Sequence, residues 1–337
     1  MALCKIMSKR KLTKQQISRI EQARAKQLSH LENPLPIHET GESQQQLGLV
    51  VSYFGRETKI ETPEGRVISC RLRQNLGNLV VGDLITWEAD QEDNGVITAR
   101  RPRTSEFFRV DKRGQTKLIA ANIAQVIIVI APEPTPPEGL LDSYLVAAEL
   151  LALTPIILLN KVDLTEHYFE FFQLYEDIYR STSYPLLRTS ALEDPEMGQL
   201  KNILADKTSV LVGPSGTGKS SLISRLSPHS SVGIGPLGAK SRLGTHTTST
   251  TQLYRLQDVT GHILDSPGIR EFGLWNIKPE QLQKGFIEFR DFLELCQFSN
   301  CTHTHEPNCG LQIGLEQGKI HPKRLENYRL LFSKYKK

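Results

Sequence analysis

One short segment constrains the fold of this chain more than any other. It follows the pattern of Gly, four free positions, Gly, Lys and then Ser or Thr, and it reads Gly213-Pro214-Ser215-Gly216-Thr217-Gly218-Lys219-Ser220. A β-branched, apolar run at 208–212 precedes it, and residues 221–226 space their apolar side chains as a helix does. The sequence therefore predicts a strand, a phosphate-binding loop and a helix, in that order.

The predicted loop assigns chemistry to particular groups. Glycines let successive backbone amides point at phosphate oxygens, and the following helix adds the positive end of its dipole. Lys219 would place a positive charge on the phosphates, and the Ser220 hydroxyl would ligate magnesium. The alternative is a glycine-rich turn before a surface helix, which the flanking patterns disfavour. We expect nucleotide phosphates to contact residues 213–220 and Ser221.

A second motif follows the apolar run at 156–159 and reads Asn160-Lys161-Val162-Asp163. A carboxylate at the end of a strand can accept hydrogen bonds from N1–H and the exocyclic amine of guanine, which adenine does not offer. Asn160 would brace the nucleotide loop, and the aliphatic stem of Lys161 would cover a face of the base. Alone this tetrapeptide also fits a surface turn, but together with a phosphate loop it predicts guanine recognition.

Three further segments fit the same nucleotide site. Ser190 and Ala191 follow the apolar run at 186–188 and match a backbone segment that contacts the guanine oxygen. Residues 227–251 are rich in Gly, Ser and Thr, as in a loop ordered by a γ-phosphate and magnesium, with Thr247 or Thr248 as the metal ligand. Asp265 ends a predicted strand, where an acid holds magnesium through water, and the Gly268 amide would contact the γ-phosphate.

The chain before residue 104 has a different character. Residues 1–45 are polar and basic and predict a partly helical or disordered arm. Residues 46–103 alternate over short segments separated by turns, which predicts a small antiparallel barrel of the five-stranded oligonucleotide-binding (OB) type. Trp87 is assigned to its core. Basic residues expected to line a nucleic-acid face are Arg56, Lys59, Arg66, Arg71, Arg73, Arg100, Arg101 and Arg103.

Composition limits the class of protein. With 337 residues, 39% hydrophobic and 23% charged, the chain has room for two or three domains. No apolar run is long enough for a membrane span and the basic N-terminus lacks a secretory apolar block, so a cytoplasmic location is expected. Basic ends on a chain of net charge +4 favour nucleic acid over a membrane as partner, although solvated tails would look the same.

Three cysteines and a histidine gather near the C-terminus. Cys296, Cys301, His303 and Cys309 offer three thiolates and one imidazole, a set that suits a structural, tetrahedral zinc ion. The spacing is not that of a common zinc finger, so buried free cysteines are the alternative, and His305 competes with His303 as the ligand. Helices are expected over 281–295 and 325–335.

The order of the motifs is informative, because the guanine motif precedes the phosphate loop, whereas ordinary small GTPases have the reverse order. The chain therefore resembles the circularly permuted GTPases, and from about residue 46 to the end it is similar to the small-ribosomal-subunit-dependent family among them. The resemblance implies an OB-type barrel at 46–103, a circularly permuted α/β P-loop GTPase domain with a mostly parallel sheet at 104–275, and a helical zinc-binding domain at 276–337.

The same resemblance implies an activity and partners. GTP hydrolysis would need Mg²⁺, be stimulated by the small ribosomal subunit and its rRNA, and serve late maturation of that particle, with the protein as a monomer. Ile269 stands where many small GTPases place the glutamine that orients water, so His246 is implied as the replacement beside Lys219 and Asp265; an exposed loop histidine without a role is the alternative. The resemblance also favours His303 over His305 as the zinc ligand.

Two other classes of function are considered. A non-enzymatic RNA-binding scaffold would not need the full set Lys219, Ser220, Asp163 and Asp265. A P-loop ATPase or small-molecule kinase is disfavoured by Asp163 and by the lack of an acceptor-substrate domain.

Overall fold

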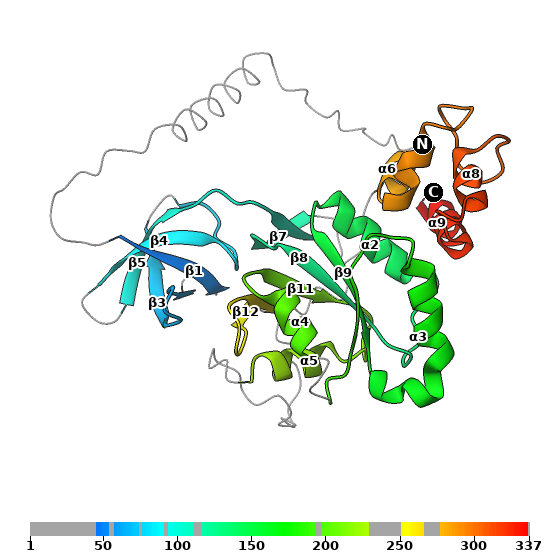
Figure 1. The fold of residues 1–337 in the computed structure, drawn as a ribbon. Coiled ribbons are helices and arrows are strands. Elements are labelled where there is room, and N and C mark those ends of the chain that lie inside the picture. The colour runs from blue at the N-terminus through cyan, green and yellow to red at the C-terminus, as the bar shows by residue number, and fades with distance from the viewer. Residues whose placement is uncertain are drawn as a thin grey trace, which may run out of the picture. The chain divides into compact units, whose positions relative to one another are not determined.

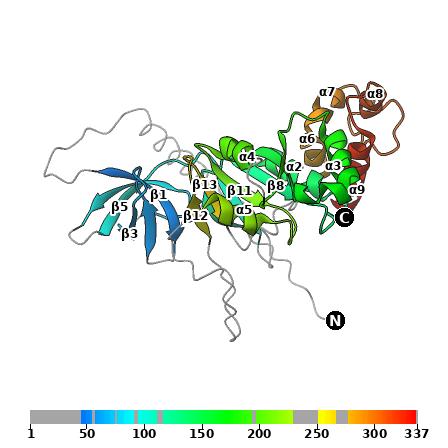
Figure 2. The same cartoon turned by 60° about the horizontal axis from the view of Figure 1, so that its bottom comes forward.

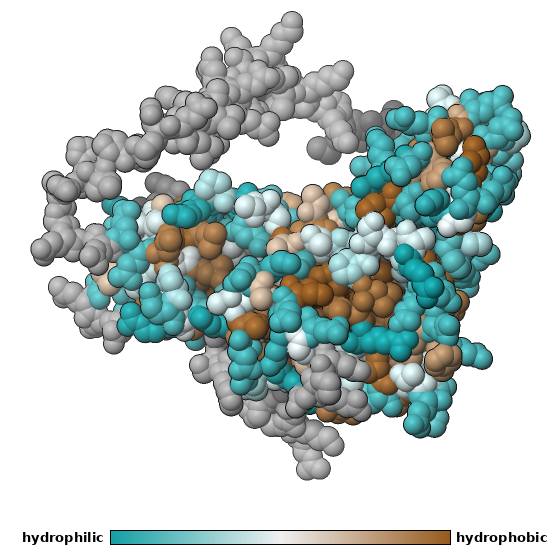
Figure 3. Space-filling view, viewed as in Figure 1, coloured by the Kyte–Doolittle hydropathy of each residue, from teal (hydrophilic) through white to brown (hydrophobic). Residues whose placement is uncertain are grey.

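The computed structural model describes residues 45–53, 57–73, 76–90, 94–110, 116–192, 197–228, 251–265 and 277–335. Figure 1 shows their helices and strands. The predicted N-terminal arm lies outside these residues. Among the described residues no helix is both long and apolar enough to cross a membrane. On the face in Figure 3 the hydrophobic surface is divided into patches with hydrophilic residues between them.

The first five strands close into a barrel. They are β1 (Gln46–Tyr53), β2 (Thr58–Glu61), β3 (Val67–Leu72), β4 (Leu84–Ala89) and β5 (Asn94–Arg100). Pairings β1–β2, β2–β3, β3–β5, β5–β4 and β4–β1 complete a ring, and β3–β5 is the parallel pair. The predicted five-stranded barrel of the OB type is therefore present, and it is antiparallel except for this one pair. Five strands in a closed ring cannot all alternate in direction, so one neighbouring pair must be parallel.

The barrel has its own apolar core. Trp87 is 2% exposed and its indole donates to the Leu47 carbonyl at 3.2 Å, which confirms it as a core residue. Around it pack the buried residues Val50, Ile60, Cys70, Leu79, Ile85 and Ile97. In β4 and in the first half of β5 buried residues alternate with less buried ones, as expected for strands with one face toward a core.

A hairpin, which the sequence analysis did not predict, follows the barrel. Strands β6 (Glu106–Val110) and β7 (Thr116–Ala121) pair antiparallel in a separate two-stranded sheet. Phe107 and Ala120 are buried, and Val81 of the barrel segment forms a bridge with Ala120. The hairpin thus attaches the end of the barrel to the start of the next sheet.

The parallel sheet contains β8 together with the strands predicted at 156–159, 186–188, 208–212 and before Asp265. They are β8 (Gln125–Ile130), β9 (Thr154–Asn160), β10 (Leu186–Thr189), β11 (Thr208–Val212) and β13 (His262–Asp265), in the order β10-β9-β8-β11-β13. β12 (Gln252–Arg255) pairs antiparallel with β13. All six residues of β8 are buried, because helices cover both faces of the sheet.

Helices cover this sheet (Figures 1 and 2), and apolar side chains fill the space on both of its faces. On one face, Val126, Ile128 and Ile130 pack with α2 (Leu140–Leu150) and α3 (Thr165–Tyr179). On the other, Ile127 and Val129 pack with α4 (Met197–Leu204) and α5 (Lys219–Leu226). The chain leaves β8 toward β9 and returns to its other side at β11, which makes the β8–β11 crevice a topological switch point.

The C-terminal segment is helical, but its helices are shorter and more numerous than expected. It contains α6 (Pro279–Lys284), the 3-10 turn η3 (Ile287–Phe289), α7 (Arg290–Leu293), α8 (Gly310–Glu316) and α9 (Pro322–Tyr335). The helix expected over 281–295 is broken after Lys284, where Phe286 is extended and stacks on Phe289 at 4.7 Å. Gly285 packs so closely that a Cβ there would lie 2.4 Å from Val146 Cγ1. The helix expected over 325–335 lies within α9.

A strand pairing connects the barrel with the β12–β13 hairpin. β1 pairs antiparallel with β12 at Ser52 and Gln252, which links both sheets into one of eleven strands. Next to this pairing the buried Glu61 carboxylate accepts hydrogen bonds from Arg255 at 2.8 Å and His262 at 3.2 Å. Burial of Glu61 opposes its ionisation, but His262 and Arg255 outweigh this and lower its pKa below the usual range.

Candidate nucleotide site and metal centre

The predicted nucleotide motifs meet at one edge of the parallel sheet. Asn160 ends β9, Thr189 ends β10, Gly213 follows β11 and Asp265 ends β13. Because these strands are parallel, their carboxyl ends lie at the same edge of the sheet, and so do these four positions. The phosphate loop lies at the topological switch point, which is where open α/β sheets bind ligands.

The backbone of the phosphate loop is held tightly. Gly213 has φ +141°, and a Cβ there would lie 2.1 Å from the Val129 carbonyl oxygen. Lys219 begins α5, and its ammonium donates to the carbonyls of Gly213 at 2.9 Å and Pro214 at 2.5 Å. The lysine charge therefore lies over the loop. The remaining predicted residues of this segment are Ser215, Gly216, Thr217, Gly218, Ser220 and Ser221, of which Ser220 and Ser221 are exposed at the start of α5.

The guanine motif touches the phosphate loop directly. Asn160 is 1% exposed and donates from Nδ2 to the Thr217 carbonyl at 2.7 Å. Gly218 has φ +92°, and a Cβ there would lie 2.3 Å from the same Nδ2 atom. Lys161 adopts φ +68° and its ammonium donates to the Glu133 carbonyl at 2.7 Å. A buried amide thus ties the end of β9 to the loop of β11.

Asp163 and Ser190 face each other across two strand ends. Asp163 is exposed in the 3-10 turn η1 (Val162–Leu164), and Ser190 Oγ donates to its Oδ1 atom at 2.6 Å. The Leu192 amide donates to the same hydroxyl at 3.1 Å. Ala191, predicted beside the base, lies between these residues. The structure therefore brings together the acid and the backbone segment that the sequence assigned to guanine.

The remaining predicted nucleotide residues divide into two groups. Asp265 is described and exposed at the end of β13. His246, Thr247, Thr248 and Gly268 lie outside the described residues.

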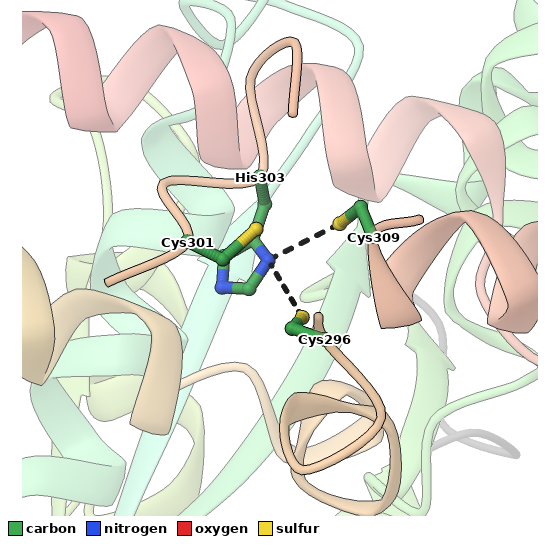
Figure 4. A group of neighbouring side chains, drawn as sticks. All are labelled: Cys296, Cys301, His303 and Cys309. Atoms are coloured by element: carbon green, nitrogen blue, oxygen red, sulfur yellow. Dashed lines mark hydrogen bonds between the residues drawn. The ribbon is translucent and has the colours of Figure 1, made fainter. Parts of the chain in front are cut away.

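The predicted metal ligands form a compact cluster. Ligand atoms of Cys296, Cys301, His303 and Cys309 all lie within 4.8 Å of one another. His303 Nδ1 is 3.3 Å from Cys309 Sγ and 3.6 Å from Cys296 Sγ, as Figure 4 shows. In a tetrahedral zinc site, bonds of about 2.0–2.3 Å separate neighbouring ligand atoms by about 3.5–3.8 Å. Three sulfurs and one nitrogen at this spacing fit a zinc ion.

Neighbouring groups orient the cluster. His303 Nε2 lies 2.8 Å from Gln283 Oε1 of α6, and an amide oxygen there requires the proton on Nε2. Nδ1 is then free to offer its lone pair toward the sulfurs. Burial raises the pKa of Cys301 to about 12, so a cation that binds there would displace the proton of this thiol. His305 is exposed and is not in the cluster.

The loop that carries Cys301 and His303 is fixed by Glu306. Its carboxylate accepts from the Thr302 amide at 2.9 Å, the Thr302 hydroxyl at 2.5 Å and the Thr304 amide at 3.0 Å. Neither Glu306 nor Gln283 belongs to a motif recognised in the sequence. An acid four residues after a threonine is a weak local signal of such a turn, but nothing local marks Gln283, which is 20 positions from His303.

The basic face predicted for the barrel is partly wrong. Arg103 is 10% exposed and its guanidinium binds the buried Asp83 at 2.7 Å and the Asn78 carbonyl at 2.9 Å. It therefore supports the barrel instead of facing solvent. Arg56 lies outside the described residues. The exposed basic residues are Arg66, Arg71, Arg73 and Arg101, whereas Lys59 and Arg100 are half-buried.

A phosphate loop that follows the guanine motif in the chain, on a P-loop sheet beside an OB-type barrel and a Cys/His cluster, defines the class of circularly permuted GTPases. The model of the RsgA GTPase family matches residues 100–275. Small ribosomal subunit biogenesis GTPase RsgA of Hahella chejuensis is 44% identical over 332 residues, 96% of this chain and 95% of that protein. The chain belongs to the RsgA GTPase family.

Other relatives agree. RsgA of Pseudomonas aeruginosa is 42% identical over 329 residues, covering 96% of this chain and 97% of that protein. The crystal structure of YjeQ from Thermotoga maritima matches with a TM-score of 0.71 and 33% identity, over 87% of this chain and 99% of that one. YloQ, titled a circularly permuted GTPase, matches with a TM-score of 0.69 and 25% identity, over 90% and 98%.

Proposed function

We propose that this protein hydrolyses GTP, binds the small ribosomal subunit and acts late in its maturation, with hydrolysis accelerated by the subunit. One observation carries the nucleotide part: the buried Asn160 amide joins the guanine motif to the phosphate loop through Thr217, at 2.7 Å. Base and phosphate subsites are thereby held at a fixed spacing. Similarity over nearly the whole chain to proteins named for small-subunit biogenesis supports the partner.

Each nucleotide residue has a role in this proposal. Asp163 accepts from guanine, Ser190 orients Asp163, and the Ala191 amide contacts the guanine oxygen. Residues 213–221 bind the phosphates, with Lys219 adding charge. Magnesium is held by Ser220, by Thr247 or Thr248, and through water by Asp265, while the Gly268 amide contacts the γ-phosphate and His246 orients the attacking water.

The other parts of the chain serve the partner. The barrel at 46–103 would contact rRNA through phosphate and shape, with exposed Arg66, Arg71 and Arg73 as candidates. One structural zinc ion would fix the 276–337 domain through Cys296, Cys301, His303 and Cys309. The GTPase domain would span 104–275. A cytoplasmic monomer fits an assembly factor that binds one particle.

Nucleotide choice tests the hydrolase and excludes its rivals. GTP and ATP turnover would be measured for the wild-type protein and for Lys219→Ala and Asp163→Ala variants. GTP should be the preferred substrate, with turnover reduced at least tenfold in both variants. An equal preference for ATP would favour a P-loop ATPase. Absence of turnover, with co-sedimentation on small subunits retained, would favour an RNA-binding scaffold.

A further inference from the structure

We infer that Arg225 is a positioning residue for guanine selectivity, because it holds the base-recognition loop against the helix that starts at the phosphate loop. The inference rests on the proposed function, since it assigns a task within the same nucleotide site. Arg225 lies one residue before the end of α5 (Lys219–Leu226). It belongs to none of the motifs recognised in the sequence, and 34 positions separate it from Ala191.

The contacts of Arg225 with the loop are direct. Its Nη1 atom donates to the Ala191 carbonyl at 3.0 Å and to the Leu192 carbonyl at 3.2 Å. A guanidinium that binds two successive carbonyls fixes two successive peptide planes, which a single exposed hydrogen bond would not do. The helix that presents Lys219 to the phosphates therefore also sets the position of the loop at 190–192.

The effect reaches the guanine acceptor through two more hydrogen bonds. The peptide whose carbonyl is held at Ala191 has its N–H on Leu192, and this amide donates to Ser190 Oγ at 3.1 Å. Ser190 is fully buried, and its hydroxyl donates to Asp163 Oδ1 at 2.6 Å. Fixing this peptide therefore fixes the hydroxyl, and the hydroxyl orients the carboxylate.

This chain of contacts predicts an effect on the base and not on the phosphates. Without Arg225 the 190–192 loop loses its anchor, and both the Ala191 amide and the Asp163 carboxylate lose their fixed positions toward guanine. The phosphate loop keeps its own anchors, which are the Asn160–Thr217 hydrogen bond and the Lys219 contacts. Arg225 is thus a second tie between the two subsites, at the base side.

The test compares GDP and ADP affinities of the full-length protein by competition with a fluorescent GDP analogue. The Arg225→Met variant keeps the aliphatic stem and removes the donors. We expect GDP binding to weaken about fivefold to tenfold, as for loss of one or two hydrogen bonds, with ADP binding unchanged. Arg225→Lys should recover part of the selectivity. GTP turnover should show a raised KM with kcat at saturation retained.

Arg188→Met is the matched control. Arg188 lies on β10, close to the same loop in sequence, but its guanidinium binds Glu176 of α3 at 2.5 Å. This variant should keep the wild-type ratio of GDP to ADP affinity. If Arg225→Met kept the wild-type ratio of GDP to ADP affinity, whether both affinities stayed the same or both weakened equally, this inference would be overturned and the proposed function would stand. A wild-type protein without preference for GDP would overturn the proposed function and this inference with it.

Discussion

At the scale of single residues, Gly218 shows how closely base and phosphate subsites are packed. A methyl group there would lie 2.3 Å from Asn160 Nδ2, at a backbone φ of +92°. Gly218→Ala must therefore displace the asparagine or the loop, and either change breaks the Asn160–Thr217 hydrogen bond. We expect GDP affinity, measured by calorimetry, to fall at least tenfold, about 1.4 kcal/mol or more.

Gly198→Ala is the control for this substitution. Gly198 lies in α4, and nothing lies within 4 Å of a Cβ added there. Alanine should leave GDP affinity unchanged and raise the free energy of unfolding by about 0.5–1 kcal/mol, because it favours helix. Equal GDP affinities of the two variants would contradict the assigned close approach.

Glu61 allows a prediction about pH. Its lowered folded-state pKa means that the contacts with Arg255 and His262 stabilise the protein above the ordinary glutamate pKa near 4.5, and that this contribution is lost as pH falls through the lowered folded-state pKa. Glu61→Gln should lower the free energy of unfolding by about 1–3 kcal/mol at pH 7. In urea titrations the difference from wild type should shrink below pH 4.5, and a difference that grew there would contradict the pairing.

At the scale of elements, a buried arginine fixes α9 to α2. Arg324 of α9 is fully buried between Asp142 of α2 and Glu288 of η3, and stacks 4.5 Å from the Phe286 ring centroid. Arg324→Met would leave two carboxylates buried without their cation. We expect a loss of about 3–5 kcal/mol in the free energy of unfolding, measured in urea.

A surface ion pair is the comparison for Arg324. Arg290 binds Glu149 at 2.6 Å but is 47% exposed, so Arg290→Met should cost no more than about 1 kcal/mol. Equal losses in the two variants would mean that the buried pair does not hold the C-terminal helices in place.

The parts of the fold that could be read from the sequence are those with local signals. Apolar runs marked β9, β10 and β11, and glycine with lysine marked the phosphate loop. Features set by distant contacts could not be read from local patterns. The parallel β3–β5 pair results from closure of the ring of strands, and the helix break after Lys284 results from contacts of Gly285 and Phe286 with residues distant in sequence. Arg225 and Gln283 were missed for the same reason, because their partners are distant in sequence and meet them only in the folded chain.

At the scale of the whole molecule, metal removal should affect one part of the chain. A strong chelator should increase hydrogen exchange in 296–335 much more than in the parallel sheet, since the cluster is the cross-link of the 296–309 loop. Gln283→Ala, which removes the partner of His303, should weaken zinc binding about 10–100-fold in competition with a chromophoric chelator. If the purified protein contained no zinc and the chelator left its hydrogen exchange unchanged, a structural role for the metal would be contradicted.

The proposed dependence of GTP turnover on the small ribosomal subunit is the property on which the function rests. It is tested most directly by GTP turnover of the purified protein, alone and with small subunits, with large subunits and ATP as controls. We expect slow turnover alone and a large acceleration that requires both GTP and small subunits. Turnover that is the same with and without small subunits would contradict this dependence.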